Sequence, residues 1–136
     1  MAGDVPLIRA VDLSAEEKKY YGIRNIEGET VRREVIIAQE YVVTHCEEEL
    51  TWEILSEIVG ISPGYLRKLY RKWCHYRLRD FQNICRMQKA AAYLTGTTGS
   101  VQEICHLVGM RNASYFTVLF RQVHGVTPTE YRQMYG

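Results

Sequence analysis

Residues 51–60 (TWEILSEIVG) and residues 100–109 (SVQEICHLVG) are two copies of one pattern, 49 positions apart. Each copy begins with a hydroxyl residue that can cap a helix, has a small residue four positions before its end, and ends on glycine. These positions are Thr51, Ser56 and Gly60 in the first copy and Ser100, Cys105 and Gly109 in the second. The small residue allows a second helix to cross closely, and the glycine permits a turn with positive φ. The repeat therefore predicts two helix-turn-helix units.

A second helix is expected after each glycine, opened by a new cap at Ser62 or Asn112. The offset becomes 50 there, because the second turn has one extra residue. We place the first unit at about 51–76 and the second at about 100–125. Their expected core residues are Leu55, Ile58, Leu66 and Leu69 in the first unit, and Ile104, Leu107, Phe116 and Phe120 in the second.

The remaining segments also have helical periodicity, so the predicted fold is all-α with about seven helices. Apolar residues recur through 78–95 at the spacing of one long amphipathic helix, which would link the two units. A capping box with proline at its first helical position opens a C-terminal helix at about 128–135. A further helix is expected within 30–46, after an N-terminal extension, 1–32, that contains a short helix from Ser14 and a loop at 22–29.

Charge is strongly segregated along the chain, although its 136 residues carry a net charge of only +1. Residues 1–49 have six basic and eleven acidic residues, whereas residues 50–136 have eleven basic and five acidic residues. Within residues 62–89 eight basic residues accompany one acidic residue, Asp80. Such a local excess attracts polyanions whatever the total charge is. Near-neutrality therefore does not exclude a nucleic-acid partner.

Several function classes lack support in the sequence. No apolar run approaches the roughly 20 residues that span a bilayer, and no secretory signal opens the chain, so no membrane partner is expected. The spacing of the cysteines contains no CxxC pair, and no phosphate loop, HExxH or GxSxG motif occurs. Two disulfides are formally possible, but we expect free buried thiols at Cys46, Cys74, Cys85 and Cys105. We expect no catalytic residues, no metal and no cofactor.

The residues of the second half carry a family signature. Its positions are Leu94, Ser100-Val101, Ile104, Val108-Gly109, Ser114-Tyr115-Phe116, Phe120-Arg121, Gly125, Pro128 and Tyr131-Arg132. This order resembles the AraC/XylS family of bacterial transcription regulators over about residues 33–136. The resemblance implies a DNA-binding domain whose two recognition helices enter successive major grooves on one face of double-stranded DNA. It also implies a cytoplasmic regulator, not an enzyme, that activates transcription and contacts RNA polymerase.

The resemblance also implies roles for individual residues. Candidates for contacts with base edges are Ser62, Gly64, Arg67 and Lys68 in the first unit, and Asn112, Ala113, Ser114 and Thr117 in the second. Candidates for contacts with the DNA backbone are Arg71, Lys72, Arg77, Arg79, Arg111 and Arg121. We expect Tyr65, Tyr115 and Phe116 to be packing residues.

Three departures from the family pattern qualify these expectations. The family usually has alanine at Ser56 and Cys105, commonly has glycine at His75, and often has a basic residue at Val118. Residues 100–136 contain only three basic residues against two acidic ones, so the first unit should dominate DNA affinity. An alternative is a protein-binding module of the same fold that acts through a partner regulator or chaperone.

Residues 1–32 precede the matched region and are too few for a cupin-like ligand barrel. The chain is therefore either a stand-alone regulator or a fragment. The acidic extension could bind a partner protein, mimic phosphate in autoinhibition, or be a simple solvated extension.

Overall fold

A computed structural model describes residues 32–136, and within this range the chain forms seven helices and no strand. The helices are α2 (Arg33–Thr44), α3 (Trp52–Val59), α4 (Pro63–Trp73), α5 (Leu78–Gly96), α6 (Val101–Leu107), α7 (Ala113–His124) and α8 (Pro128–Tyr135). The all-α prediction is confirmed. The helix expected from Ser14 and the loop expected at 22–29 lie outside the described residues.

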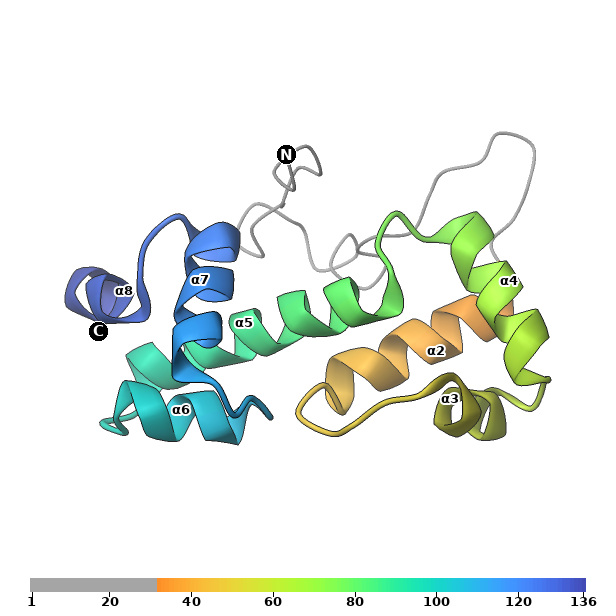
Figure 1. Ribbon diagram of the computed structural model, residues 1–136, viewed down its shortest axis with the longest axis horizontal. Coiled ribbons are helices and arrows are strands. Elements are labelled where there is room, and N and C mark those ends of the chain that lie inside the picture. The colour runs from red at the N-terminus through yellow and green to blue at the C-terminus, as the bar shows by residue number, and fades with distance from the viewer. Residues whose placement is uncertain (1–31) are drawn as a thin grey trace.

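Helix α5 runs through the middle of the molecule and separates two groups of helices (Figure 1). Helices α2, α3 and α4 pack against one another at one end of α5, where α2 contacts α5, and helices α6, α7 and α8 pack against the other end. The repeated sequence thus forms two helix-turn-helix units, α3–α4 and α6–α7, joined by α5.

The turn chemistry of the first unit follows from its sequence. The Thr51 hydroxyl accepts a hydrogen bond from the Ile54 amide (3.2 Å), and the Ser62 hydroxyl accepts one from the Tyr65 amide (3.2 Å). Between these caps, Gly60 ends α3 with φ +88°, a left-handed conformation that favours glycine. The caps and the glycine together determine where each helix begins and ends.

The second unit repeats this chemistry with a stronger first cap. Ser100 and Glu103 form a reciprocal capping box at the start of α6, and Asn112 caps α7 through its side-chain oxygen. Gly109 lies in the turn between them with φ +89°. Two equivalent turns of nearly equal φ explain why the repeat is visible in the sequence.

Ile58 and Leu107 do not belong to the core, which corrects two expected core positions. Their side chains are 47% and 53% exposed, whereas Leu55 and Ile104 are fully buried. In a helix the residues three and four positions after a buried residue lie on either side of it, because each residue turns the helix by about 100°. Both helices face the core on the side of the residue four positions later. The residue three positions later is therefore exposed to solvent.

Four cysteines, Cys46, Cys74, Cys85 and Cys105, are buried in the described part of the chain and form no disulfide there, as expected. Burial raises the pKa of the Cys85 thiol well above its usual range and also raises that of Cys46. Buried neutral thiols of this kind behave as small apolar side chains and contribute to packing.

Candidate DNA-binding surface

The basic cluster predicted at 62–89 is mostly solvent-exposed. Six of its eight basic side chains are exposed on α4, on the following loop and at the start of α5. They are Arg67, Lys68, Arg71, Lys72, Arg77 and Arg79. These side chains supply a positive surface around α4, the second helix of the first unit.

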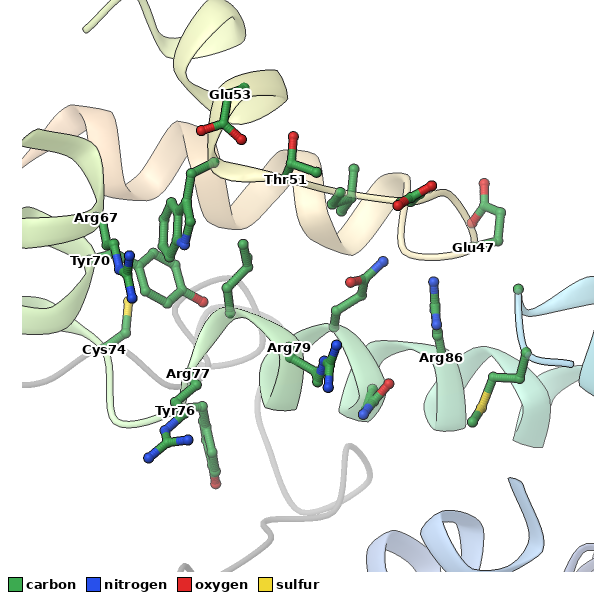
Figure 2. A pocket seen from close by; sticks show the side chains of 18 of the residues that line it. Glu47, Thr51, Glu53, Arg67, Tyr70, Cys74, Tyr76, Arg77, Arg79 and Arg86 are labelled. Atoms are coloured by element: carbon green, nitrogen blue, oxygen red, sulfur yellow. The ribbon is translucent and has the colours of Figure 1, made fainter. Parts of the chain in front are cut away.

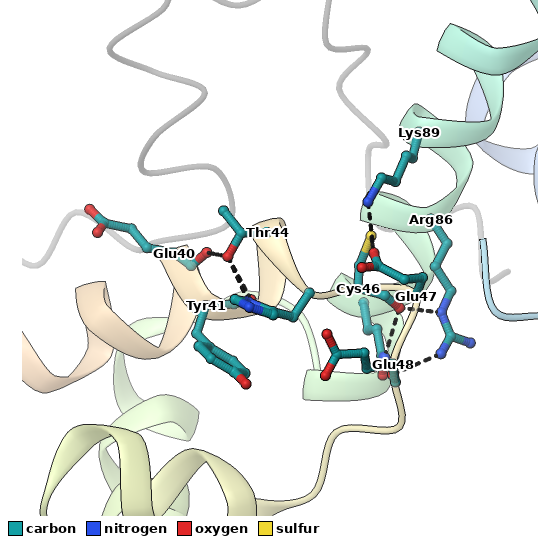
Figure 3. Close-up of polar contacts among 10 residues, drawn as sticks. Glu40, Tyr41, Thr44, Cys46, Glu47, Glu48, Arg86 and Lys89 are labelled. Carbon is teal, nitrogen blue, oxygen red and sulfur yellow. Dashed lines mark hydrogen bonds and ion pairs between the residues drawn. The ribbon is translucent and has the colours of Figure 1, made fainter. Parts of the chain in front are cut away.

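The other two basic residues of the cluster, Arg86 and Lys89, make internal contacts with the loop between α2 and α3 (Figure 3). Lys89 forms an ion pair with Glu47 (Nζ–Oε2 2.7 Å), which raises the pKa of Lys89 and lowers that of Glu47. Arg86 donates to the Cys46 carbonyl (2.5 Å), and burial lowers its pKa. Their charges therefore add little to the exposed positive surface.

An open groove of about 1630 Å³ passes between the two units. Six arginines line it: Arg67, Arg71, Arg77, Arg79, Arg86 and Arg111. Glu47, Thr51 and Glu53 lie on the opposite side of the groove from Arg79 and Arg86 of α5 (Figure 2). The acidic stretch 47–49 thus belongs to the loop beside this groove and not to the N-terminal extension.

On α4, the predicted base-contact residues Ser62, Gly64, Arg67 and Lys68 are all exposed. The opposite face of the helix is buried through Leu66, Leu69, Tyr70 and Trp73. Only Arg67 among the four candidates lines the groove, together with Arg71 one turn later. A Cβ added to Gly64 would meet nothing within 4 Å, so this part of α4 is open to a ligand.

On α7, the predicted base-contact residues Asn112, Ala113 and Ser114 are exposed, and Thr117 is half-buried. The Thr117 hydroxyl donates to the Ala113 carbonyl (3.0 Å), so it is already partnered within the helix. Arg111 and Arg121, the predicted backbone contacts of this unit, are exposed. The structure thus places most of the candidates at the N-terminal half of α7.

Tyr65 and Tyr115 are exposed, contrary to the expectation that they are packing residues. Their side chains are 43% and 49% exposed, whereas Phe116, the third residue of that expectation, is fully buried. Both tyrosines lie in the first turn of their helices, where the chain enters from outside the core. They occupy equivalent positions in the two units, so the repeat in the sequence could have identified them as a matched pair.

Arg32 and Tyr65 form a contact that the sequence did not reveal. The Arg32 guanidinium donates to the Tyr65 hydroxyl (3.2 Å) and pairs with Glu34 (3.3 Å). Arg32 precedes α2 in the chain, so this contact brings the start of the domain beside the recognition helix α4. Arg32 and Tyr65 therefore extend the candidate surface beyond the predicted residues.

Residues 32–136 contain no group of three or more histidine, cysteine or acidic side chains arranged to hold a metal ion. None of the helices in this range is long and apolar enough to cross a membrane.

Comparisons with known proteins agree with this architecture. Residues 55–134 match the model of a helix-turn-helix domain family. The chain is 33% identical over 100 residues to the bifunctional transcriptional activator/DNA repair enzyme AdaA of Bacillus subtilis, covering 74% of this chain and 47% of AdaA. Other curated relatives, such as the regulatory protein PocR of Salmonella typhimurium, are matched over about a third of their length (32% for PocR). The chain thus spans at most about half the length of these relatives.

Solved structures show the same fold. The C-terminal domain of AraT, a response regulator from Geobacillus stearothermophilus, superposes with a TM-score of 0.67 at 29% identity, covering 78% of this chain and 88% of that one. A probable AraC family transcriptional regulator from Rhodopseudomonas palustris gives a TM-score of 0.69 at 25% identity, covering 76% and 97%. The chain belongs to the AraC-type family of helix-turn-helix domains, the DNA-binding domains of transcription regulators.

Proposed function

We propose that this chain acts as a sequence-specific transcription regulator that inserts α4 and α7 into successive major grooves on one face of the duplex. The observation that carries the proposal is the position of the two helix-turn-helix units at opposite ends of α5. A helix of 19 residues is about 28 Å long, close to the roughly 34 Å of one turn of DNA.

In this proposal the candidate residues divide into two groups by their position. Those at the N-terminal halves of α4 and α7 read bases: Ser62, Gly64, Arg67 and Lys68, with Asn112, Ala113, Ser114 and Thr117. The remaining cations bind phosphates and fix the orientation of the domain: Arg71, Lys72, Arg77, Arg79, Arg111 and Arg121. They lie on α4, in the loop after it, at the start of α5, in the α6–α7 turn and on α7, and these positions support contacts with the DNA between the two major grooves.

We also propose that the protein is regulatory and not catalytic, activates transcription in the bacterial cytoplasm, and contacts RNA polymerase. AdaA, which is named as an activator, supports the direction of regulation. Because the chain spans under half of AdaA, the activity of the whole protein rests on this proposal and not on the match.

Selection from random duplexes with the purified chain tests the DNA-reading part of the proposal. We expect enrichment of a site with two conserved segments, about one helical turn apart from centre to centre. The double variant Arg67→Ala/Ser114→Ala should enrich a weaker motif, while Gln102→Ala, an exposed change on α6, should reproduce the wild-type motif. Enrichment of no motif by the folded wild-type protein would contradict sequence-specific reading.

A second candidate function, binding to a partner protein, is supported by the surface of the second unit. Leu107 and Val118 each expose 53% of their side chains there. The basic residue Arg132 of the neighbouring helix α8 donates to the Leu94 carbonyl at the end of α5 (3.0 Å) and so serves a structural role. Under this alternative the selection enriches nothing, and the variant Val118→Asp weakens capture of the partner without changing the fold.

A further inference from the structure

The loop of residues 45–51, which joins α2 to α3, is held against α5 through its backbone. Gln82 donates to the carbonyl oxygens of Cys46 (3.0 Å) and Glu48 (2.7 Å). Arg86 donates to the same two carbonyls, at 2.5 Å and 3.2 Å (Figure 3). Two neighbouring side chains of α5 thus bind two alternate carbonyls of the loop, which fixes both its position and its direction.

The turn of the second unit packs directly on this loop. A Cβ added to Gly109 would overlap the Glu47 carbonyl oxygen and would lie 2.9 Å from the carbonyl carbon. Real Cβ atoms do not approach backbone so closely, so only glycine allows this contact between the turn and the loop. Residues 45–51 therefore touch both α5 and the α6–α7 turn.

Gly60, at the equivalent turn of the first unit, provides an internal comparison. Its φ of +88° matches the +89° of Gly109, but a Cβ added to Gly60 would meet nothing within 4 Å. Both glycines are needed for the same backbone conformation, and only Gly109 is also needed for a close contact. The close contact is thus a separate requirement from that of the turn.

We propose that loop 45–51, Gln82, Arg86 and Gly109 form a clasp that sets the position of α7 relative to α4. The Gln82 and Arg86 side chains and Gly109 are positioning residues, because they act on the recognition helices and not on DNA. Gln82 and Arg86 hold the loop that follows α2, and Gly109 precedes α7. The clasp is therefore a second connection between the two units, beside the one made by α5. The consequence for DNA rests on the proposed function: a fixed pair of recognition helices accepts one spacing between its two subsites.

The first experiment measures the clasp without DNA. Spin labels on unnatural amino acids at Glu57 of α3 and Gln122 of α7, both exposed, report the distance between the units in the full chain. The wild-type protein and Gly60→Ala should give the same narrow distance distribution. Gly109→Ala and the double variant Gln82→Met/Arg86→Met should broaden it or shift its centre, because the loop is no longer held against both α5 and the α6–α7 turn.

The second experiment measures spacing on the duplex selected with the wild-type protein. Insertion of one base pair between the two subsites moves them apart by about 3.4 Å and rotates them by about a tenth of a turn. We expect this insertion to weaken wild-type and Gly60→Ala binding by at least about tenfold. For Gly109→Ala and Gln82→Met/Arg86→Met the loss should fall to about threefold or less. For each protein the comparison is the ratio of its affinities for the two duplexes. A loss of positive charge on the protein weakens binding to both duplexes alike and therefore cancels in this ratio.

The two experiments separate failure of the clasp from failure of the proposed function. A wild-type distance distribution in both clasp variants, with melting curves that show folded protein, would overturn the clasp even if DNA is bound specifically. An altered distribution in a protein that enriches no motif would retain the clasp and overturn DNA reading. If Gly109→Ala does not fold, Gln82→Met/Arg86→Met alone decides, because it leaves the turn unchanged.

Discussion

Lys89 lies 2.7 Å from the Glu47 carboxylate, so one of the eight cations at 62–89 is neutralised within the protein. Arg86, one turn earlier on α5, donates to backbone carbonyls of the same loop. The charge that the sequence assigns to one basic cluster is therefore divided between two tasks. Six exposed cations remain to face a polyanion, and two hold the loop between α2 and α3.

The first prediction concerns the salt dependence of DNA binding. If five or six of the exposed cations neutralise phosphates, log K should fall against log salt concentration with a slope of about −4.5 to −5.5. Arg71→Met should make the slope shallower by about 0.9, since one phosphate contact is lost. Lys89→Met should leave it nearly unchanged. Fluorescence anisotropy titrations at several salt concentrations measure all three slopes, and an equal effect of both substitutions would contradict the division of charge.

Arg67 and Arg71 should differ in what they recognise. Arg67→Ala should weaken binding to the selected site by about 1–3 kcal/mol and affect random DNA much less, because a guanidinium that reads a guanine edge loses a sequence-dependent contact. Arg71→Ala should weaken binding to both duplexes to a similar extent. Competition titrations with the two duplexes give the ratio directly. Equal losses for Arg67→Ala would make Arg67 a phosphate contact.

Gly64→Ala should have opposite effects on stability and on binding. Gly64 lies in the first turn of α4, with open space around the position of a Cβ, so alanine should stabilise the fold by about 0.5 kcal/mol through its better helix propensity. If DNA approaches this backbone closely, the added methyl group should weaken specific binding. Urea unfolding and titration of the selected site test the two effects. Unchanged affinity would place Gly64 outside the interface.

Val118→Arg should strengthen the second unit. Val118 is 53% exposed on α7, so an arginine can be accommodated without disturbing the core. One added phosphate contact should raise affinity at low salt and steepen the salt slope by about 0.9. Gln122→Arg, one turn later on the same helix, tests whether any added charge has this effect. Equal gains from both variants would indicate a non-specific field and no contact at 118.

Acid should weaken the fold through carboxylates whose pKa is lowered in the native state. Hydrogen bonds with Ser100 and Thr127 lower the pKa of the capping-box residues Glu103 and Glu130. A lowered pKa contributes stability above the ordinary value of about 4.3, and this contribution is lost as the pH falls through the native pKa. Glu103→Gln/Glu130→Gln should therefore lose less stability than the wild type on acidification below about pH 4.

The matched control for this experiment is Glu57→Gln, an exposed substitution on α3. Urea unfolding midpoints at neutral and acidic pH compare the three proteins. If the capping-box variant and the control lose the same stability as the wild type, the two capping carboxylates do not contribute to the acid sensitivity.

Most of the fold was predictable because its determinants are local. The helix caps and the turn glycines act within four residues, so their spacing in the sequence determines the local geometry of the structure. The caps are Thr51, Ser62 and Ser100, and the glycines are Gly60 and Gly109. The exposed apolar side chains Ile58 and Leu107 were not predictable. Apolar periodicity defines a helix, but which edge of the apolar face is buried depends on the helices packed against it.

The candidate site was predictable only in part, for the same reason. The position of the candidate residues at the starts of α4 and α7 followed from their distance after each turn, and the surplus of positive charge could be counted in the sequence. The pairing of Lys89 with Glu47 and of Arg32 with Tyr65 joins residues 42 and 33 positions apart, and no local pattern marks such partners.

The sequence by itself determined that the chain has two helix-turn-helix units joined by a long helix, because capping, turn and periodicity are short-range effects. Only the tertiary structure decided which cations face solvent, which aromatic residues remain exposed, and why Gly109 meets a requirement that Gly60 does not. Those properties depend on which distant segments pack together. The loop at 45–51 lies against α5 and the second turn, and that contact converts two similar repeats into units with different constraints.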